Sequence, residues 1–286
     1  MQHPAGLPQD LAALDRTLVM GVVNVTPDSF SDGGNFFASD AAIAQGRALA
    51  LAGADILDIG GESTRPGAQR VSLDEELSRV VPVIEVLARD GYHVSVDTMR
   101  GAVAMEAVRA GACIVNDVSG GLGEPDMLST VATLDVPYIV MHWRGHSDVM
   151  TSLTEYEEVV SDVATELSKR IDAAIAHGIH PSRIVLDPGL GFAKDAEHNW
   201  ALLRGIETLQ LLGRPILIGA SRKRFLGQLL ADASGTPRAV FARDAATDAV
   251  TALSAAHDAW AVRVHDVRAS ADAVRVAYAW KRGGDV

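Results

Sequence analysis

Three consecutive cations follow an apolar stretch of this chain. In ILIGASRKRFLG, residues 216–227, a Gly-Ala step leads into Ser221-Arg222-Lys223-Arg224. The formal net charge is −12, so a local run of cations implies a specific anionic target. A helix that starts here would add backbone N–H groups and its dipole to the cations. We expect the run to face a ligand, with at least one of Arg222 and Arg224 on the surface or in a salt bridge.

Further polar residues stand at the ends of other short apolar runs. Asp97, Asn116 and Asp187 offer carboxylate and amide groups that suit the in-plane N–H donors and carbonyl of a fused nitrogen heterocycle. A second set suits the oxygens of a phosphoryl group. Its members are Asn24, Thr64, Arg65, Arg263 and His265. Together the two sets predict a site for a heterocycle that carries a phosphate ester.

The elements that position these residues alternate along the chain. Short runs rich in Val and Ile predict strands buried on both faces, and helix-like segments lie between them. Ser39 or Asp40 is the expected N-cap of one helix, and Ser72 with Glu75 has the capping-box spacing for another. The predicted strands are residues 18–25, 55–60, 93–98, 113–118, 138–143, 183–189, 215–221 and 260–267.

Such alternation requires parallel strands with helical crossovers, and eight units in 286 residues favour a closed barrel over an open sheet. We therefore predict an α/β fold, a single (β/α)8 TIM barrel over residues 17–286 after an N-terminal extension at 1–16. Chemistry in such barrels gathers at the C-terminal ends of the strands. Two of these residues have an alternative structural role. Arg263 would form a salt bridge to Asp266 or to a neighbouring strand, and His265 would be a hydrogen-bonded residue at the barrel rim.

Composition narrows the function classes. A pI near 5.1 argues against a nucleic-acid partner, and the sequence contains no run of 18 apolar residues that would span a membrane. The first 16 residues do not have the pattern of a signal peptide, and the single Cys113 cannot form an internal disulfide. These features indicate a cytoplasmic protein, and we expect no transition-metal site made by protein ligands alone.

Eight motifs in order resemble the dihydropteroate synthase family from about Leu18 to Trp280. They are MGVVNVTPDSFSDGG, DIGGESTRPGA, SVDT, NDVSGG, VMH, LDPGLGFAK, GASRKRFLG and RVHDV. The resemblance implies a TIM barrel and the condensation of 4-aminobenzoate with (7,8-dihydropterin-6-yl)methyl diphosphate, which yields 7,8-dihydropteroate and diphosphate for folate synthesis. It also implies Mg2+, sulfonamide inhibitors and a homodimer.

The resemblance implies roles at matching positions. The pterin ring would be held by Asp97, Asn116, Met141, Asp187 and Lys223. The diphosphate would be engaged by Thr64, Arg65, Arg263 and His265, with Asn24 as the ligand of a shared Mg2+. The aminobenzoate carboxylate would sit at Ser221 and the helix start, and its ring near Phe30, Pro66 and Phe192.

Two long loops, residues 26–36 and 63–71, are candidate lids over this site. In the first, Asp32 is either a carboxylate that steadies a cationic intermediate or a solvated turn residue beside Gly33. The segment MHWRGHSDVM departs from the family pattern, so Trp143 and Arg144 receive no role. Two other functions remain open: a pterin-binding methyltransferase domain on the same fold, and a non-catalytic pterin-binding paralogue.

Overall fold

The computed structural model describes residues 2–25, 34–62, 70–145 and 153–284, and of residues 34–38 only the backbone. Within these ranges, eight parallel strands form one sheet in the order β6-β5-β4-β3-β2-β1-β8-β7. A parallel bridge between Leu186 and Ile216 joins β6 to β7 and brings the two ends of the sheet together. The strands are β1 (Leu18–Asn24), β2 (Ile56–Gly60), β3 (Val94–Asp97), β4 (Ile114–Asp117), β5 (Tyr138–Met141), β6 (Ile184–Asp187), β7 (Leu217–Ile218) and β8 (Ala261–Val264).

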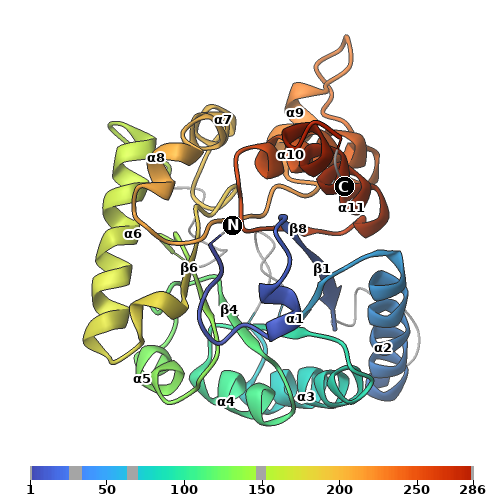
Figure 1. The fold of residues 1–286 in the computed structure, drawn as a ribbon, viewed down its shortest axis with the longest axis vertical. Helices are drawn as coiled ribbons and strands as arrows, with labels where there is room; N and C mark the ends of the chain where they lie inside the picture. The colour runs from blue at the N-terminus through green and yellow to red at the C-terminus, as the bar shows by residue number, and fades with distance from the viewer. Residues whose placement is uncertain (1, 26–33, 63–69, 146–152, 285–286) are drawn as a thin grey trace.

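Helices surround the strands as an outer ring (Figure 1), which confirms the predicted TIM barrel. The longer helices are α2 (Gly34–Ala52), α3 (Leu73–Arg89), α4 (Gly101–Arg109), α6 (Val159–Ala176), α7 (Ala196–Arg204), α10 (Asp244–Ala256) and α11 (Val267–Lys281). The short ones are α1 (Gln9–Ala12), α5 (Met127–Ala132), α8 (Ile206–Gln210), α9 (Arg224–Leu229) and two 3-10 turns, η3 (Pro181–Arg183) and η4 (Val240–Arg243). Among the described residues, no helix is long and apolar enough to cross a membrane.

One of the two predicted helix starts is correct. The Ser72 side chain caps α3 by accepting a hydrogen bond from the backbone N–H of Glu75 at 3.2 Å, while the Glu75 carboxylate pairs with Arg79. The other prediction is wrong, because α2 begins at Gly34 and both Ser39 and Asp40 lie inside it. No proline lies between Gly34 and Ser39, so the sequence does not prevent the helix from beginning before the cap-forming residues.

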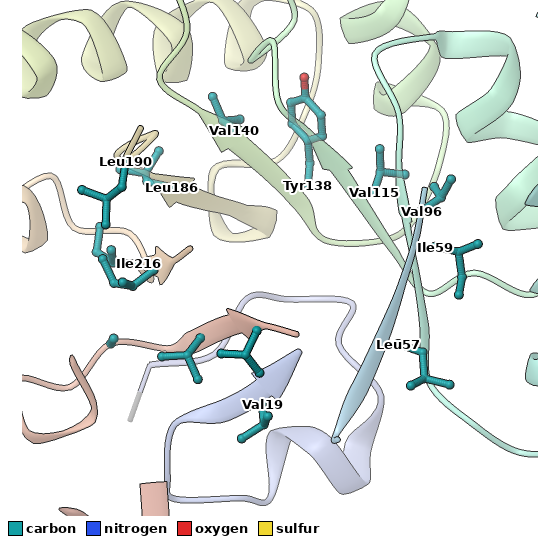
Figure 2. Close-up of a cluster of buried hydrophobic side chains, with 14 of the residues drawn as sticks. Val19, Leu57, Ile59, Val96, Val115, Tyr138, Val140, Leu186, Leu190 and Ile216 are labelled. Atoms are coloured by element: carbon teal, nitrogen blue, oxygen red, sulfur yellow. The ribbon is translucent and has the colours of Figure 1, made fainter. Parts of the chain in front are cut away.

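Alternation along the strands divides their side chains between two apolar clusters. The outer cluster lies between strands and helices and includes Val19, Leu57, Val96 and Val115 (Figure 2). The inner cluster fills the barrel near the N-terminal ends of the strands. Its strand members are Leu18, Met20, Ile56, Ile114, Ile139, Val185, Leu217 and Ala261.

The N-terminal segment closes the barrel from below. Leu7 and Leu11 belong to the inner cluster, and the segment with α1 lies across the barrel in Figure 1. The Trp260 indole, also in this cluster, donates to the His3 ring at 3.3 Å. The lower half of the barrel is therefore a closed plug that is apolar except for the buried Ser95 on β3, and charged groups gather above it.

A polar layer follows the apolar one because side chains two residues apart on a strand point the same way. Asp58 comes two residues after Ile56, Asn116 after Ile114, Asp187 after Val185 and Arg263 after Ala261. The alternation of side chains along the strands thus produces a layer of charged and polar groups near the C-terminal ends of the strands.

Candidate active site

Arg263 on β8 reaches across β1 to contact side chains on β2 and β3. Its Nε donates to Asp58 Oδ2 on β2 at 2.6 Å, and its Nη2 donates to Asp97 Oδ2 on β3 at 2.7 Å. Asn116 on β4 donates from Nδ2 to the same Asp58 oxygen at 3.0 Å. Arg263 therefore forms salt bridges, but with β2 and β3, which lie beyond its neighbour β1, and not with Asp266. Three predicted residues, Asp97, Asn116 and Arg263, come together around Asp58.

Asp58 itself was not predicted as a site residue. It is fully buried, and it links a guanidinium to an amide whose carbonyl oxygen is thereby left to accept from a ligand. The sequence did contain an indication of its role. Burial of a carboxylate inside the apolar strand DILDIG is energetically unfavourable unless the carboxylate has partners.

Burial sets the electrostatics of this layer. Loss of solvent raises the pKa of Asp97 to about 7, an effect that Asp58 reinforces and Arg263 opposes. Burial also raises the pKa of Asp187, against the attraction of Lys223. Three carboxylates thus face two cations, Arg263 and Lys223, so the layer favours a ligand that brings N–H donors or positive charge.

Asp187 and Lys223 lie on the other side of the layer. Asp187 Oδ1 accepts the backbone N–H of Gly189 at 2.7 Å, and Lys223 Nζ donates to the carbonyl of Leu190. Burial lowers the pKa of Lys223 to about 8. A Cβ on Gly219 would lie 3.7 Å from Asp187 Oδ2, 3.9 Å from Lys223 Nζ and 4.0 Å from Arg263 Cβ. The glycine therefore keeps the space where these groups converge clear of a side chain.

The structure separates the three cations of the SRKR run. Lys223 turns into the site, whereas Arg222 forms an ion pair with Asp244 at 2.7 Å and lies over the ring of Phe241. Arg224 is exposed. Arg222 has a φ of +59°, and this left-handed residue lets the chain enter α9 with Lys223 directed inward. The expectation that at least one arginine of the run would face away is confirmed.

Ser221 and His265 form a pair across the ends of β7 and β8. The Ser221 Oγ accepts the backbone N–H of His265 at 3.1 Å and lies 2.9 Å from its Nδ1. Phe192 is half-buried, and its ring centroid lies 4.9 Å from Lys223 Nζ. Met141 is buried at the end of β5, in register with Asp187. These residues border the same strand ends as the polar layer.

The remaining predicted residues differ in how far the structure describes them. Asn24 ends β1, half-buried, with Gly60 as its neighbour on β2. The other five, Phe30, Asp32, Thr64, Arg65 and Pro66, lie outside the described residues. In the part of the chain that is described, no group of three or more His, Cys, Asp or Glu side chains is placed to hold a metal ion.

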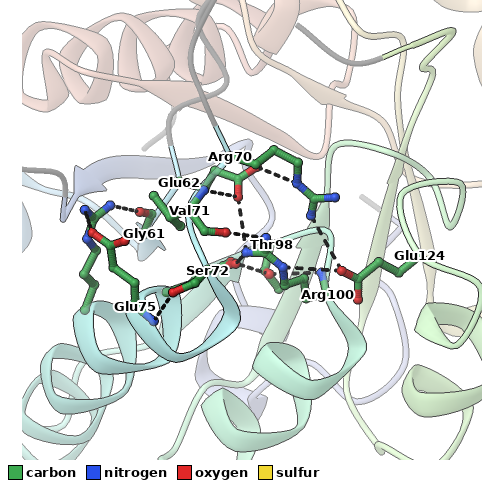
Figure 3. A network of polar contacts seen from close by, with 11 residues as sticks. Gly61, Glu62, Arg70, Val71, Ser72, Glu75, Thr98, Arg100 and Glu124 are labelled. Carbon is green, nitrogen blue, oxygen red and sulfur yellow. Dashed lines mark hydrogen bonds and ion pairs between the residues drawn. The ribbon is translucent and has the colours of Figure 1, made fainter.

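Both flanks of residues 63–69 are anchored by arginines (Figure 3). Arg79 donates to the carbonyl of Gly61 at 2.8 Å, and Arg100 donates to the carbonyl of Val71 at 2.6 Å. Arg100 also pairs with Glu62, at 3.2 Å, and with the buried Glu76. Gly61, Glu62 and Val71 are thus held in place on the rim beside Asp97.

A second cluster, also absent from the predicted site residues, lies behind the turn after β6. The buried Lys194 is 2.9 Å from Nδ1 of His142, whose Nε2 is 2.8 Å from Glu166 on α6. His142 stands four residues before His146 in the sequence, a spacing that metal ligands use on helices. Here His142 follows a strand, and both its ring nitrogens are engaged by protein groups.

Comparison with known proteins shows which family has this arrangement. The family model described as "Pterin binding enzyme" matches residues 20–265. The chain is 51% identical to the dihydropteroate synthase of Mycobacterium leprae over 267 residues, which cover 93% of this chain and 94% of the relative.

Solved structures give the same result. One is the Xanthomonas albilineans dihydropteroate synthase with 4-aminobenzoic acid, at a TM-score of 0.85 and 45% identity over 95% of this chain and 94% of that one. Another is the Yersinia pestis dihydropteroate synthase in a sulfonamide drug complex, at a TM-score of 0.88 and 39% identity over 99% and 100% of the two chains. This chain therefore belongs to the dihydropteroate synthase family, transferases of folate biosynthesis on a pterin-binding barrel.

Proposed function

We propose that the strand-end site joins 4-aminobenzoate to (7,8-dihydropterin-6-yl)methyl diphosphate and releases diphosphate. The observation that carries the proposal is the charged layer itself. Asp97, Asn116 and Asp187 offer acceptors to a heterocycle with several N–H donors, and Lys223 offers a donor to its carbonyl. Family membership and the 4-aminobenzoic acid complex of the Xanthomonas albilineans enzyme support the same substrates.

The reaction forms a C–N bond at a methylene carbon while diphosphate leaves. Because an arylamine is a weak nucleophile, stabilising the leaving group is the main task, and the transition state carries positive charge on the pterin methylene. Asp97 and Asp187 favour that charge from below the ring. Arg263, His265, Thr64 and Arg65 engage the diphosphate. The arylamine loses its proton after bonding, so the site needs no strong base.

Mg2+ fits this site only as a partner of the diphosphate. Asn24 supplies one amide oxygen, and the described residues around it offer no cluster that would hold the ion alone. When bound, Mg2+ supplies positive charge to the leaving diphosphate. We expect a chelator to abolish activity while the free protein stays folded, as measured by turnover and circular dichroism. Tight Mg2+ binding without diphosphate would contradict this assignment.

The aminobenzoate lies nearer the rim in this proposal. Its carboxylate sits at Ser221 and the start of α9, near Lys223, and its ring contacts Phe192, Phe30 and Pro66. Asp32 steadies the cationic intermediate when the loop around it closes. Sulfonamides present a similar anion at a similar distance from an aryl amine, so they compete for this place, in line with the drug complex of the Yersinia pestis enzyme.

The test is incubation with both substrates and measurement of diphosphate and dihydropteroate. Asp187→Asn is the informative variant, because its amide places an N–H against a ligand donor in a buried site. Such a clash costs about 1–3 kcal/mol, which is roughly a fivefold to 150-fold weaker pterin affinity by calorimetry. Pterin affinity equal to that of the unaltered protein would remove Asp187 from the cradle.

The same assay separates the two competing functions. A methyltransferase domain would bind a pterin but release no diphosphate, and a non-catalytic paralogue would bind without turnover. Neither accounts for the presence of Lys223, Arg263 and His265 at the ends of β7 and β8, where an anion would lie.

We also propose a cytoplasmic homodimer in which residues 17–286 form the catalytic barrel and residues 1–16 an extension. The dimer rests on the family and on α10 and α11, which expose Leu253 and Trp280. Light scattering of the purified protein would test it, and a monomer at all concentrations would rule it out.

A further inference from the structure

The turn after β6, residues 189–194, takes a shape that its own backbone does not favour. Gly189 and Gly191 have φ values of +67° and +78°, and Ala193, which has a Cβ, has φ +48°. An alanine in the left-handed region is disfavoured unless the surroundings hold it there. The turn carries Phe192 and the Leu190 carbonyl that accepts from Lys223, so its shape matters to the site.

Side chains bind three backbone groups at the apex of this turn. The Gly191 N–H donates to Asn199 Oδ1 at 2.6 Å. The Phe192 carbonyl accepts from Lys194 Nζ at 3.0 Å, and the Ala193 carbonyl accepts from the Tyr156 hydroxyl at 3.0 Å. These bonds compensate for the unfavourable backbone and leave the turn one arrangement.

Lys194 is the most deeply buried of these donors, at 4% exposure. The Glu166 carboxylate can only accept from the ring, so the proton of the neutral His142 ring sits on Nε2, and Nδ1 accepts from Lys194 Nζ. Nε2 then donates to Glu166 Oε2, and Arg144 holds Glu166 through an ion pair at 2.5 Å. The chain of bonds runs from α6 through the end of β5 to the turn, and each member orients the next.

The electrostatics agree with this assignment of protons. Burial, with Lys194 nearby, lowers the pKa of His142 to about 4, so the imidazole is neutral at pH 7. Burial lowers the pKa of Lys194 to about 7. An uncharged amine still has two N–H groups, one for His142 and one for the Phe192 carbonyl, so both bonds survive in either state of the lysine.

From this geometry we propose that Lys194, oriented by His142 and Glu166, is a positioning residue for the arylamine half of the site. It fixes the Phe192 carbonyl and with it the place of the Phe192 ring. Packing alone is a poor explanation for this lysine, because an apolar side chain would fill the buried position without the desolvation of an amine. The inference rests on the proposed function, in which Phe192 contacts the aminobenzoate ring.

A matched pair of His142 variants tests the proposal. His142→Asn keeps an acceptor where Nδ1 stands and loses the donor to Glu166. His142→Gln keeps a donor where Nε2 stands and loses the acceptor for Lys194. Both remove the ring, so they share its packing loss. We expect the KM for 4-aminobenzoate to rise about tenfold in His142→Gln and to stay within about threefold in His142→Asn, with the pterin diphosphate Kd unchanged in both.

Lys194→Met removes the donor directly, and we expect the same tenfold rise in KM without a change in pterin Kd. If that variant does not fold, Tyr156→Phe takes its place, because it removes a different bond to the turn and leaves the buried amine alone. It is expected to raise KM about threefold. Equal KM values in the two His142 variants, or a parallel loss of pterin affinity, would overturn the proposal. Inactivity of the unaltered protein would instead overturn the proposed function.

Discussion

The barrel interior consists of two layers that lie one strand pleat apart and have opposite character. The lower layer contains Ile56, Ile114 and Ile139, is apolar on the strands except for Ser95, and is closed by Leu7 and Leu11. The upper layer, two residues further along the same strands, contains Asp58, Asn116 and Arg263. The same strands therefore contribute apolar side chains that stabilise the fold in the lower layer and polar side chains that form the site in the upper layer.

The upper layer is costly to maintain. Asp58 Oδ1 is buried without a hydrogen-bond partner in the part of the chain that the structure describes, and burial raises the pKa of both Asp97 and Asp187. Such groups destabilise a fold unless other parts over-determine it. The difference between the two layers implies that substitutions in the lower layer reduce only the stability of the fold. Substitutions in the upper layer change the stability, its pH dependence and the activity together.

The largest expected loss of stability comes from the lower layer. Ile139→Ala removes a fully buried side chain at a point where the surrounding strands cannot collapse, so the free energy of unfolding should fall by about 4 kcal/mol. Denaturant titration measures this change, and kcat at a temperature below the transition should stay within twofold. A large loss of kcat in the folded variant would show that the two layers are not separable.

Arg263→Met should have a somewhat smaller effect on stability and a much larger one on activity. The substitution leaves Asp58 and Asp97 without their cation, which costs about 3 kcal/mol at pH 7. Turnover should fall more than a hundredfold. The double variant Asp58→Asn/Arg263→Met should regain part of the stability and none of the activity. Recovery of both would mean that Arg263 acts only on the fold.

Asp97→Asn should change the pH dependence of stability. Because the folded pKa of Asp97, about 7, lies above its usual 3.8, the folded state holds the proton more tightly. The contribution is fully present below about pH 4 and is lost as pH rises to 7, with a slope of at most about 1.4 kcal/mol per pH unit. The variant lacks this contribution, so its free energy of unfolding should fall less steeply across that range.

A matched control for that experiment is Asp272→Asn on α11, whose carboxylate is exposed. It should leave the slope between pH 4 and 7 as it is in the unaltered protein. If Asp97→Asn also left the slope unaltered, Asp97 would be ionised in the folded state throughout that range.

The sequence predicts much of this arrangement because strand period and strand ends are local properties. Val- and Ile-rich runs predicted the strands, and polar residues at their ends predicted Asp97, Asn116 and Asp187. It did not predict which partners the charges take. The pairing of Arg263 with Asp58 depends on barrel closure, which brings β8 near β2, and the bond between Lys194 and His142 joins residues 52 positions apart. The start of α2 was missed because helix propagation past Ser39 overrides a local capping signal.

Both described ends of the chain lie on the face opposite the site. The N-terminal segment crosses the lower end of the barrel, and α11 returns there, where Arg282 pairs with Asp15. A circular permutation that joins the ends with a short linker would therefore leave the strand ends untouched. New termini in the exposed segment between α9 and η4 would then lie on the rim, where a tethered reporter could sense the approach of a ligand.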